Sequence, residues 1–328
     1  MILFLKIIKG CCMKKIMFMV LILILLMTGC TDKKKAQEDL NLVIGFIPHI
    51  QFTPLYVGIE KGIFAKHGIN LNINYGFGLD TFGLLTSSKA DIALSDADQL
   101  IISHNKGYSL QSIFQYYKKY PTSIVSLNNI NTPEGLIGKK IGVPELYGTS
   151  YIGTKKFLSH YNLDDRVELV RIGYTQIPSL LSNQVDAVVC FYNNEPIQLR
   201  MKNYEITEWK IADISELVGA SFITGETQLK NKRKLLKQFN EALSESIIFT
   251  TNNIPESIDI AYKTIGSLNE DDKMYWNEVL QKTLEIINGE NTDAGILDTK
   301  LYQETIEELY KLKLISVVFD AKEIITQL

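Results

Sequence analysis

Cysteine is scarce in this chain of 328 residues, which contains four, a density that excludes a disulfide-stapled scaffold. Basic charge is limited too: the formal net charge is −3, and the basic run at residues 230–234 lacks interleaved aromatic side chains. The sequence therefore argues against nucleic-acid binding. Hydrophobic residues make up 46% of the chain and no low-complexity tract interrupts it, so we expect one large core or two smaller ones.

Catalytic signatures are missing as well. The sequence contains no Walker A loop, no G-x-G-x-x-G after a strand and no G-x-S-x-G elbow. None of the histidines at 49, 67, 104 and 160 is paired at metal-ligand spacing. The residues alone therefore predict no catalytic centre, no metal site and no cofactor.

The apolar run at residues 16–27 has 12 residues, too few to span a bilayer as an ordinary helix, which needs ~20. It follows four lysines and has the length of a signal-peptide core. An uncleaved N-terminal anchor is the alternative interpretation. Translation could start at Met1 or at Met13, since either start leaves basic residues before the apolar run.

Residues 26–30 read Leu-Met-Thr-Gly-Cys, which resembles a bacterial lipobox, although Met27 stands where Leu is usual. We predict that residues 1–29 are a lipoprotein signal peptide and that Cys30 carries lipid. The polar, Lys-rich residues 30–39 would then be a flexible tether. The protein is accordingly expected at the cell membrane, lipid-anchored on the extracytoplasmic face.

From residue 40 onward, short apolar runs alternate with helical segments, a pattern typical of an α/β fold with a mainly parallel sheet. A second set begins at residue 132, and from residue 229 the pattern is almost wholly helical. We predict two α/β lobes, the first from residues 40–127 and 219–328 and the second from residues 128–218. Crossings near 126–129 and 218–222 would form the hinge.

Residues 84–94 and 180–189 resemble each other, since each contains a helix end, a polar turn, an aspartate and a buried strand. Ligands of open α/β sheets bind beyond the carboxyl ends of the strands. Two lobes built alike would therefore face each other with the carboxyl ends of their strands. Chance similarity over so short a stretch is the alternative.

Polar and aromatic residues gather in five loops that follow predicted strands or open predicted helices. Amides supply donors and acceptors for the edge of a heteroaromatic ring, and aromatic side chains stack on its faces. Turn, capping and core-packing roles are the alternatives for each residue. With Asp96, which ends another strand, the candidate ligand-binding residues are His49, Gln51, Phe52, Gln115, Tyr116, Tyr147, Gly148, Thr149, Ser150, Tyr174, Tyr192, Asn193, Asn194 and Glu195.

Several of these segments carry a family resemblance. Residues 45–64 contain Ile-Pro-x-x-Gln-Phe-x-Pro-Leu-Tyr-Val and end in Glu-Lys-Gly-Ile-Phe, and residues 90–93, 136–143 and 184–187 agree with them. Together they resemble the SsuA/THI5-like (NMT1) family, over about residues 40–226. The resemblance implies a type II periplasmic-binding-protein fold and, in most members, a solute-binding lipoprotein of an ABC transporter.

The finer resemblance is to the riboflavin-binding branch of that family. It rests on Pro-x-x-Gln-Phe at 48–52, Tyr-Gly-x-Ser-Tyr at 147–151 and Asn-Asn-Glu-Pro-Ile-Gln-Leu at 193–199. Binders of the thiamine pyrimidine precursor share residues like Asn-Asn-Glu, so this precursor is the second candidate ligand after riboflavin. The implied partners are a small-molecule ligand, an ABC permease and the membrane, with the chain as a monomer.

Two other members of the family offer alternative functions. The enzyme branch that makes the thiamine pyrimidine uses a reactive His and a cluster of Cys, whereas Cys190 stands alone here. Sulfonate binders need a strong anion site, and none of the four arginines falls in the five loops. We therefore expect a binding protein and not an enzyme.

We assign expected roles for the planar, neutral ring of riboflavin. Its faces would contact Tyr147, Tyr192 and Phe52, and its polar edge would meet the amides of Gln51, Asn193 and Asn194. A carboxylate, that of Asp96 or of Glu195, would bind a hydroxylated tail or an amino group.

Overall fold

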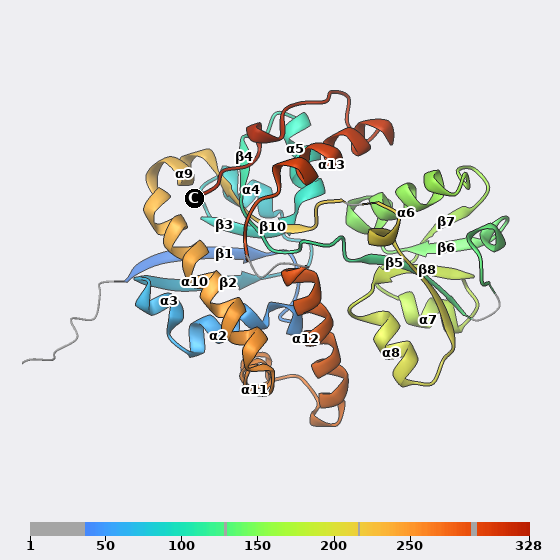
Figure 1. The fold of residues 1–328 in the computed structure, drawn as a ribbon, viewed down its shortest axis with the longest axis horizontal. Coiled ribbons are helices and arrows are strands. Elements are labelled where there is room, and N and C mark those ends of the chain that lie inside the picture. The colour runs from blue at the N-terminus through green and yellow to red at the C-terminus, as the bar shows by residue number, and fades with distance from the viewer. Residues whose placement is uncertain (1–36, 128–129, 216, 290–293) are drawn as a thin grey trace, which may run out of the picture. The chain divides into compact units, whose positions relative to one another are not determined.

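The computed structural model describes residues 37–127, 130–215, 217–289 and 294–328, and residues 37–328 form one compact unit (Figure 1). The predicted signal peptide, the lipidation site at Cys30 and most of the tether lie outside the described residues. Within the described ranges, none of the helices combines the length and the apolar character that crossing a membrane requires.

Lobe one, as defined here, is built on a five-stranded sheet that contains β1. β1 runs parallel to β2 and β3, and β10 runs antiparallel to β3 and β4. The central strands are apolar on both faces because helices cover both faces, as is usual for parallel sheets. In spatial order the strands are β2 (Ile69–Tyr75), β1 (Glu38–Ile44), β3 (Ile92–Asp96), β10 (Ala220–Gly225) and β4 (Leu110–Gln115).

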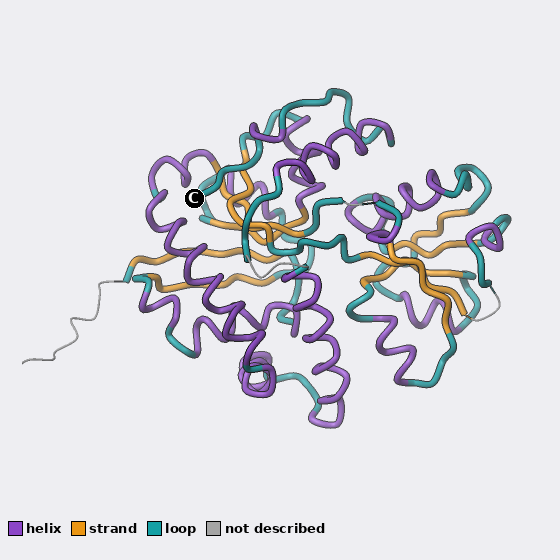
Figure 2. The backbone as a smooth tube through the Cα atoms, in the orientation of Figure 1, coloured by secondary structure: helices purple, strands orange, loops and turns teal. Residues whose placement is uncertain are grey.

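Lobe two is built on a second five-stranded sheet, and Figure 2 shows the strands in two separate groups. β6 runs parallel to β7 and β8, and β5 runs antiparallel to β8 and β9. The predicted repetition of one α/β pattern in two lobes is therefore confirmed. In spatial order the strands are β7 (Glu168–Arg171), β6 (Lys140–Val143), β8 (Ala187–Phe191), β5 (Thr122–Leu127) and β9 (Ile206–Lys210).

One predicted boundary is wrong. The sequence predicts β5 in lobe one, but β5 pairs with β8 and β9 in the sheet of lobe two. The first crossing therefore lies between Gln115 and Thr122, earlier than predicted, and the second lies between Lys210 and Ala220. An apolar strand fits either sheet by composition, so its partner is decided by non-local pairing. The other lobe boundaries stay predictions.

Helices cover both sheets, and the helical tail adds the longest ones. The α-helices are α2 (Thr53–Glu60), α3 (Ile63–Lys66), α4 (Thr81–Thr86), α5 (Ala97–Asn105), α6 (Gly148–His160), α7 (Gln176–Leu181), α8 (Glu195–Met201), α9 (Glu226–Asn231), α10 (Arg233–Asn252), α11 (Ile254–Ile265), α12 (Lys273–Asn288) and α13 (Thr299–Lys311). Short 3-10 turns are η1 (Ile50–Phe52), η2 (Pro133–Leu136), η3 (Ile211–Asp213), η4 (Glu270–Asp272) and η5 (Ala321–Glu323).

The tail packs chiefly on lobe one. α10 and α11 contact α2, and α13 contacts α5. Phe239 of α10 is fully buried and stacks on Phe64, with ring centroids 5.8 Å apart. α12 differs, because it contacts both η1 of lobe one and α8 of lobe two. The tail therefore supports the first lobe and also reaches the second.

Candidate functional site

A cavity of about 390 Å³ is lined by residues of both lobes. It lies beyond the carboxyl ends of strands such as β1, β3, β6 and β8, where ligands bind in open α/β sheets. Most of the residues predicted to bind ligand line this cavity. They are His49, Gln51, Phe52, Asp96, Tyr116, Tyr147, Gly148, Thr149, Ser150, Tyr174, Asn193, Asn194 and Glu195.

Two predicted residues lie elsewhere. Tyr192 is buried between Phe191 and Asn193, which both line the cavity, and its own ring sits beneath Lys210, 4.9 Å from the Nζ atom. Gln115 is also buried, and its Oε1 accepts a hydrogen bond from the backbone N–H of Asp298 at 3.1 Å. Neither residue follows the alternation of a strand: Tyr192 lies in the turn after β8, and Gln115 ends β4 while Tyr116 and Tyr117 after it both line the cavity.

Other residues line the cavity that the sequence patterns do not predict. Tyr117 and Phe191 lie in the predicted loops, and Ser95 precedes Asp96, so their position was a usable signal. Gln99 lines the cavity from the first turn of α5, directly after Asp96. A rule that included the first helical turn after each strand would have found it.

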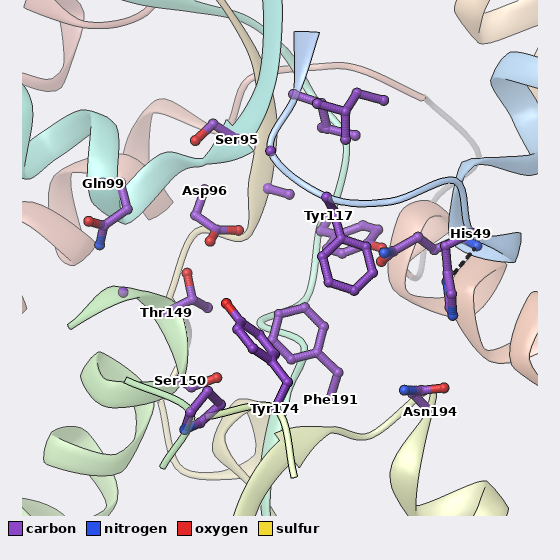
Figure 3. Close-up of a pocket in the computed structure, with 18 of the residues that line it drawn as sticks. His49, Ser95, Asp96, Gln99, Tyr117, Thr149, Ser150, Tyr174, Phe191 and Asn194 are labelled. Carbon is purple, nitrogen blue, oxygen red and sulfur yellow. Dashed lines mark hydrogen bonds between the residues drawn. The ribbon is translucent and has the colours of Figure 1, made fainter. Parts of the chain in front are cut away.

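Figure 3 shows how the side chains divide the cavity into parts. On one side of the cavity lie polar groups, namely the hydroxyl, amide and carboxyl groups of Ser95, Asp96, Gln99 and Thr149. His49 and Asn194 lie on the other side, and the rings of Tyr117, Tyr174 and Phe191 lie between the two polar groups. The arrangement suits a flat ring with one polar edge and a polar extension on the opposite side.

The charge of the lining is one-sided. Three carboxyl groups line the cavity, those of Asp96, Glu145 and Glu195, while its described lining includes no lysine or arginine. Burial raises the pKa of Asp96, and a hydrogen bond with Thr149 opposes that rise. Burial also raises the pKa of Glu195, although the backbone N–H of Phe191 donates to its Oε2 at 3.3 Å. An anionic ligand would therefore find no cationic side chain in the described lining.

Glu145 differs from the other two carboxyls because it has a cationic partner. Arg171 donates from Nη2 to Glu145 Oε1 at 2.7 Å and also binds Oε2. Hydrogen bonding to Arg171 lowers the pKa of Glu145. Arg171 itself lies outside the lining, so its charge is directed to Glu145 and not to the cavity.

Two stacked tyrosines hold the amide of Gln51. Tyr116 and Tyr117 are both buried, with ring centroids 5.1 Å apart. The Tyr117 hydroxyl donates to Gln51 Oε1 at 2.8 Å, and the Tyr116 hydroxyl donates to the Gln51 backbone carbonyl at 2.8 Å. The first and second predicted loops therefore form one rigid wall.

His49 is neutral at physiological pH, because burial lowers its pKa to about 4. Its Nδ1 accepts a hydrogen bond from the Gln51 backbone N–H at 3.3 Å, which leaves the proton on Nε2. The ring of Trp276, from α12, meets the His49 ring edge-on at 5.3 Å. His49 can therefore serve as a neutral donor.

The tandem asparagines connect the cavity to α12. Asn193 Nδ2 donates to Thr283 Oγ1 at 2.8 Å, and Asn194 Oδ1 accepts from the Tyr275 hydroxyl at 2.5 Å. Asn193 Oδ1 is buried and has no hydrogen-bond partner among the residues that the structure describes, a state that proteins rarely tolerate without a functional reason. The sequence offered no signal for Tyr275 or Thr283, because they lie about 80 to 90 positions further along the chain.

The described residues contain no cluster of three or more His, Cys, Asp or Glu able to hold a metal ion. Cys190 is buried in β8, and burial raises the pKa of its thiol, so it is unreactive there.

Gly148, at the start of α6, has φ of +78°, a conformation that favours glycine at this edge of the cavity.

The two-lobed α/β architecture is that of the periplasmic-binding-protein fold. The alkanesulfonate-binding protein SsuA of Xanthomonas axonopodis pv. citri, solved with bound MOPS, matches with a TM-score of 0.69 at 13% identity, over 89% of this chain and 100% of that one. A family model described as NMT1/THI5 like matches residues 49–257. The chain belongs to the NMT1/THI5-like family.

Two relatives are similar over most of their length. The riboflavin-binding protein RibY of Chloroflexus aurantiacus is 24% identical over 298 residues, which cover 88% of this chain and 85% of that protein. The formylaminopyrimidine-binding protein of Halalkalibacterium halodurans is 23% identical over 298 residues, which cover 86% of this chain and 88% of that protein.

Proposed function

We propose that this chain is the solute-binding protein of an ABC importer and that it captures a neutral heteroaromatic vitamin, riboflavin first, between its two lobes. The observation that carries the proposal is the composition of the cavity wall: aromatic rings, amides and hydroxyls from both lobes, with carboxyls and no cation in the described lining. Its volume of about 390 Å³ is within the range of ligand pockets, ~300–1,000 Å³.

The cavity suggests a pose for riboflavin. The ring would lie among Tyr117, Tyr174 and Phe191, where aromatic faces are available. Its polar edge would face His49 and Asn194, and its hydroxylated tail would reach Asp96. A carboxyl group accepts hydrogen bonds from hydroxyls, so Asp96 fits a polyol better than it fits a phosphate.

The thiamine pyrimidine precursor is the second candidate, and a specific relative favours it. The Halalkalibacterium halodurans relative is named as a formylaminopyrimidine-binding protein. A pyrimidine would use the same rings and amides but would leave the Asp96 side of the cavity empty. The size of the cavity and its polar extension therefore favour the larger ligand.

A sulfonate is disfavoured even though SsuA shares the fold. A sulfonate keeps its negative charge, and the lining of this cavity offers it carboxyls instead of guanidinium or ammonium groups. A pyrimidine-synthesising enzyme is disfavoured because Cys190 is buried and removed from the cavity. The permease partner, the lipid anchor at Cys30, the extracytoplasmic location and the monomeric state belong to this proposal.

Isothermal titration calorimetry of the chain tests the proposal. Riboflavin should bind at one site, the pyrimidine precursor should bind more weakly, and an alkanesulfonate should give no heat. Flavin mononucleotide should bind at least tenfold more weakly than riboflavin, because its phosphate would approach Asp96. Binding of the pyrimidine alone would replace the first ligand with the second. Binding of the sulfonate alone would overturn the proposal.

Turnover separates a binder from an enzyme. The ligand recovered after incubation should be chemically unchanged and stoichiometric with the protein. Consumption of the ligand would support the enzyme alternative instead.

Fatty-acid labelling tests the lipid anchor. Label that is incorporated into the wild type and absent in Cys30→Ala would support the anchor. If both proteins attach equally to the membrane and neither is labelled, the anchor is contradicted.

A further inference from the structure

Asp98 is a fully buried carboxyl group that lies outside the lining of the cavity. It is in the first turn of α5, on lobe one, two residues after Asp96. Its Oδ2 accepts a hydrogen bond from the Thr149 hydroxyl at 3.0 Å and from the Tyr120 hydroxyl at 2.7 Å. Its Oδ1 accepts from Gln99 Nε2 at 3.1 Å and lies 3.3 Å from the Thr149 hydroxyl.

The donors come from three different places in the fold. Gln99 belongs to α5 of lobe one, and Thr149 is the second residue of α6 of lobe two. Tyr120 lies on the first crossing between the two sheets, and its hydroxyl is also 2.8 Å from the Thr149 backbone carbonyl. One carboxyl therefore connects both lobes and the crossing at a single point.

Two of these donors also line the cavity. Gln99 and Thr149 face it from opposite lobes, and Asp98 binds both from behind. Three other polar contacts between the lobes, among the described residues, differ from this one. Lys156 and Glu308 form an ion pair at 2.7 Å that remains partly exposed. The bonds from Asn193 to Thr283 and from Tyr275 to Asn194 each involve a single cavity-lining residue, because Thr283 and Tyr275 lie outside the lining. Loss of the Asp98 carboxyl would therefore free two cavity-lining side chains at the same time, Gln99 on lobe one and Thr149 on lobe two.

We propose that Asp98 is a positioning residue that latches lobe two onto lobe one behind the bound ligand. This inference rests on the proposed function as a solute-binding protein. When the lobes separate, water replaces the Thr149 hydroxyl at the carboxylate, and when they meet, the hydroxyls of Thr149 and Tyr120 replace water. The latch therefore belongs to the closed state alone and slows release of a ligand that Asp98 never touches.

The chain offers a matched control in Asp91. It is likewise a buried aspartate of lobe one, it accepts from the Asn41 backbone N–H at 2.9 Å and it pairs with Lys232 at 2.7 Å. All of these partners lie on lobe one. Asp91→Asn therefore weakens the fold without affecting a contact between the lobes.

Stopped-flow binding of riboflavin tests the latch. Asp98→Asn should raise the dissociation rate constant about tenfold and should not lower the association rate constant, because the open state that admits the ligand stays intact and becomes more populated. Tyr120→Phe, which removes one hydroxyl, should raise dissociation about threefold, and it stands in should Asp98→Asn fail to fold. Asp91→Asn should leave both rate constants within about twofold of the wild type.

Small-angle X-ray scattering of the ligand-free chain provides a readout that does not depend on the ligand. Asp98→Asn should have a larger radius of gyration than the wild type, and Asp91→Asn should match the wild type. If the wild type binds neither riboflavin nor the pyrimidine precursor, the proposed function fails and scattering alone decides the latch. Unchanged scattering with unchanged dissociation in Asp98→Asn overturns the latch, and so do equal effects of Asp98→Asn and Asp91→Asn.

Discussion

The two walls of the cavity differ in how firmly their side chains are held. On the lobe-one wall, Tyr116 and Tyr117 have 0% and 3% of their surface exposed and hold Gln51 by hydrogen bonds. On the lobe-two wall, Tyr147 and Tyr174 are 69% and 59% exposed. Under the proposed function, lobe one would present a preformed half-site, and lobe two would supply rings that gain burial when a ligand is enclosed.

The largest expected effect comes from removing the buried wall. Tyr117→Ala should lower the free energy of unfolding by ~3–5 kcal/mol, because it leaves a cavity beside Tyr116 and frees Gln51. Tyr174→Ala should lower it by less than about 1 kcal/mol, since the ring is mostly exposed. Urea denaturation of both variants measures the difference. Equal losses in the two would remove the distinction between the walls.

The second effect is a pH dependence specific to the lobe-one wall. Because the folded pKa of His49 is about 4, the unfolded chain takes up a proton below about pH 6.5 while the folded chain does not. Stability should therefore fall as the pH falls from about 6.5 to about 4. His49→Asn keeps an acceptor for the Gln51 N–H but cannot titrate. The wild type should lose about 2 kcal/mol more than this variant between pH 7 and pH 5.

Urea denaturation of His49→Asn and of the wild type at both pH values checks this expectation. Other titrating groups act equally in the two proteins, so the difference isolates His49. The same loss in both proteins would mean that His49 is already protonated or is solvated in the folded chain.

The third effect tests the junction between lobe two and α12. Asn193→Ala should weaken riboflavin binding at least tenfold, about 1.4 kcal/mol, because it removes the unpartnered Oδ1 and leaves Thr283 without its donor. Gln115→Ala is the control, since Gln115 is buried but lies outside the cavity lining. Calorimetry should find wild-type affinity for the control. Equal losses in both variants would point to general destabilisation.

The smallest effect concerns the exposed rings. Tyr174 meets Phe77 of lobe one edge-on, with ring centroids 4.7 Å apart. Tyr174→Ala should raise riboflavin dissociation about fivefold, because an aromatic pair contributes ~0.5–1.5 kcal/mol. Tyr174→Phe keeps the ring and should behave as the wild type in stopped-flow measurements. A loss in Tyr174→Phe would assign the effect to the hydroxyl instead.

Sequence patterns located the loops of the site better than the individual side chains. The Asn-Asn-Glu loop after β8 does border the cavity, yet Tyr192 within it faces the core and Phe191 faces the cavity. Tyr192 lies in the turn after β8, where strand alternation has ended, so the sequence does not show which side chain of the loop faces the core. The same holds after β4, where Gln115 lies outside the lining while Tyr116 and Tyr117 both line the cavity.

By itself, the sequence determined the α/β class, the repetition of one pattern in two lobes and the strand-end loops that form the cavity, because these follow from local periodicity and turn residues. Tertiary structure alone decided that β5 joins the sheet of lobe two and that α12 reaches Asn193 and Asn194. It alone also brought Asp98 beneath Thr149 and Tyr120. These contacts join residues that are distant along the chain. They form because the two surfaces are buried together, and a local sequence pattern does not show which surfaces will meet.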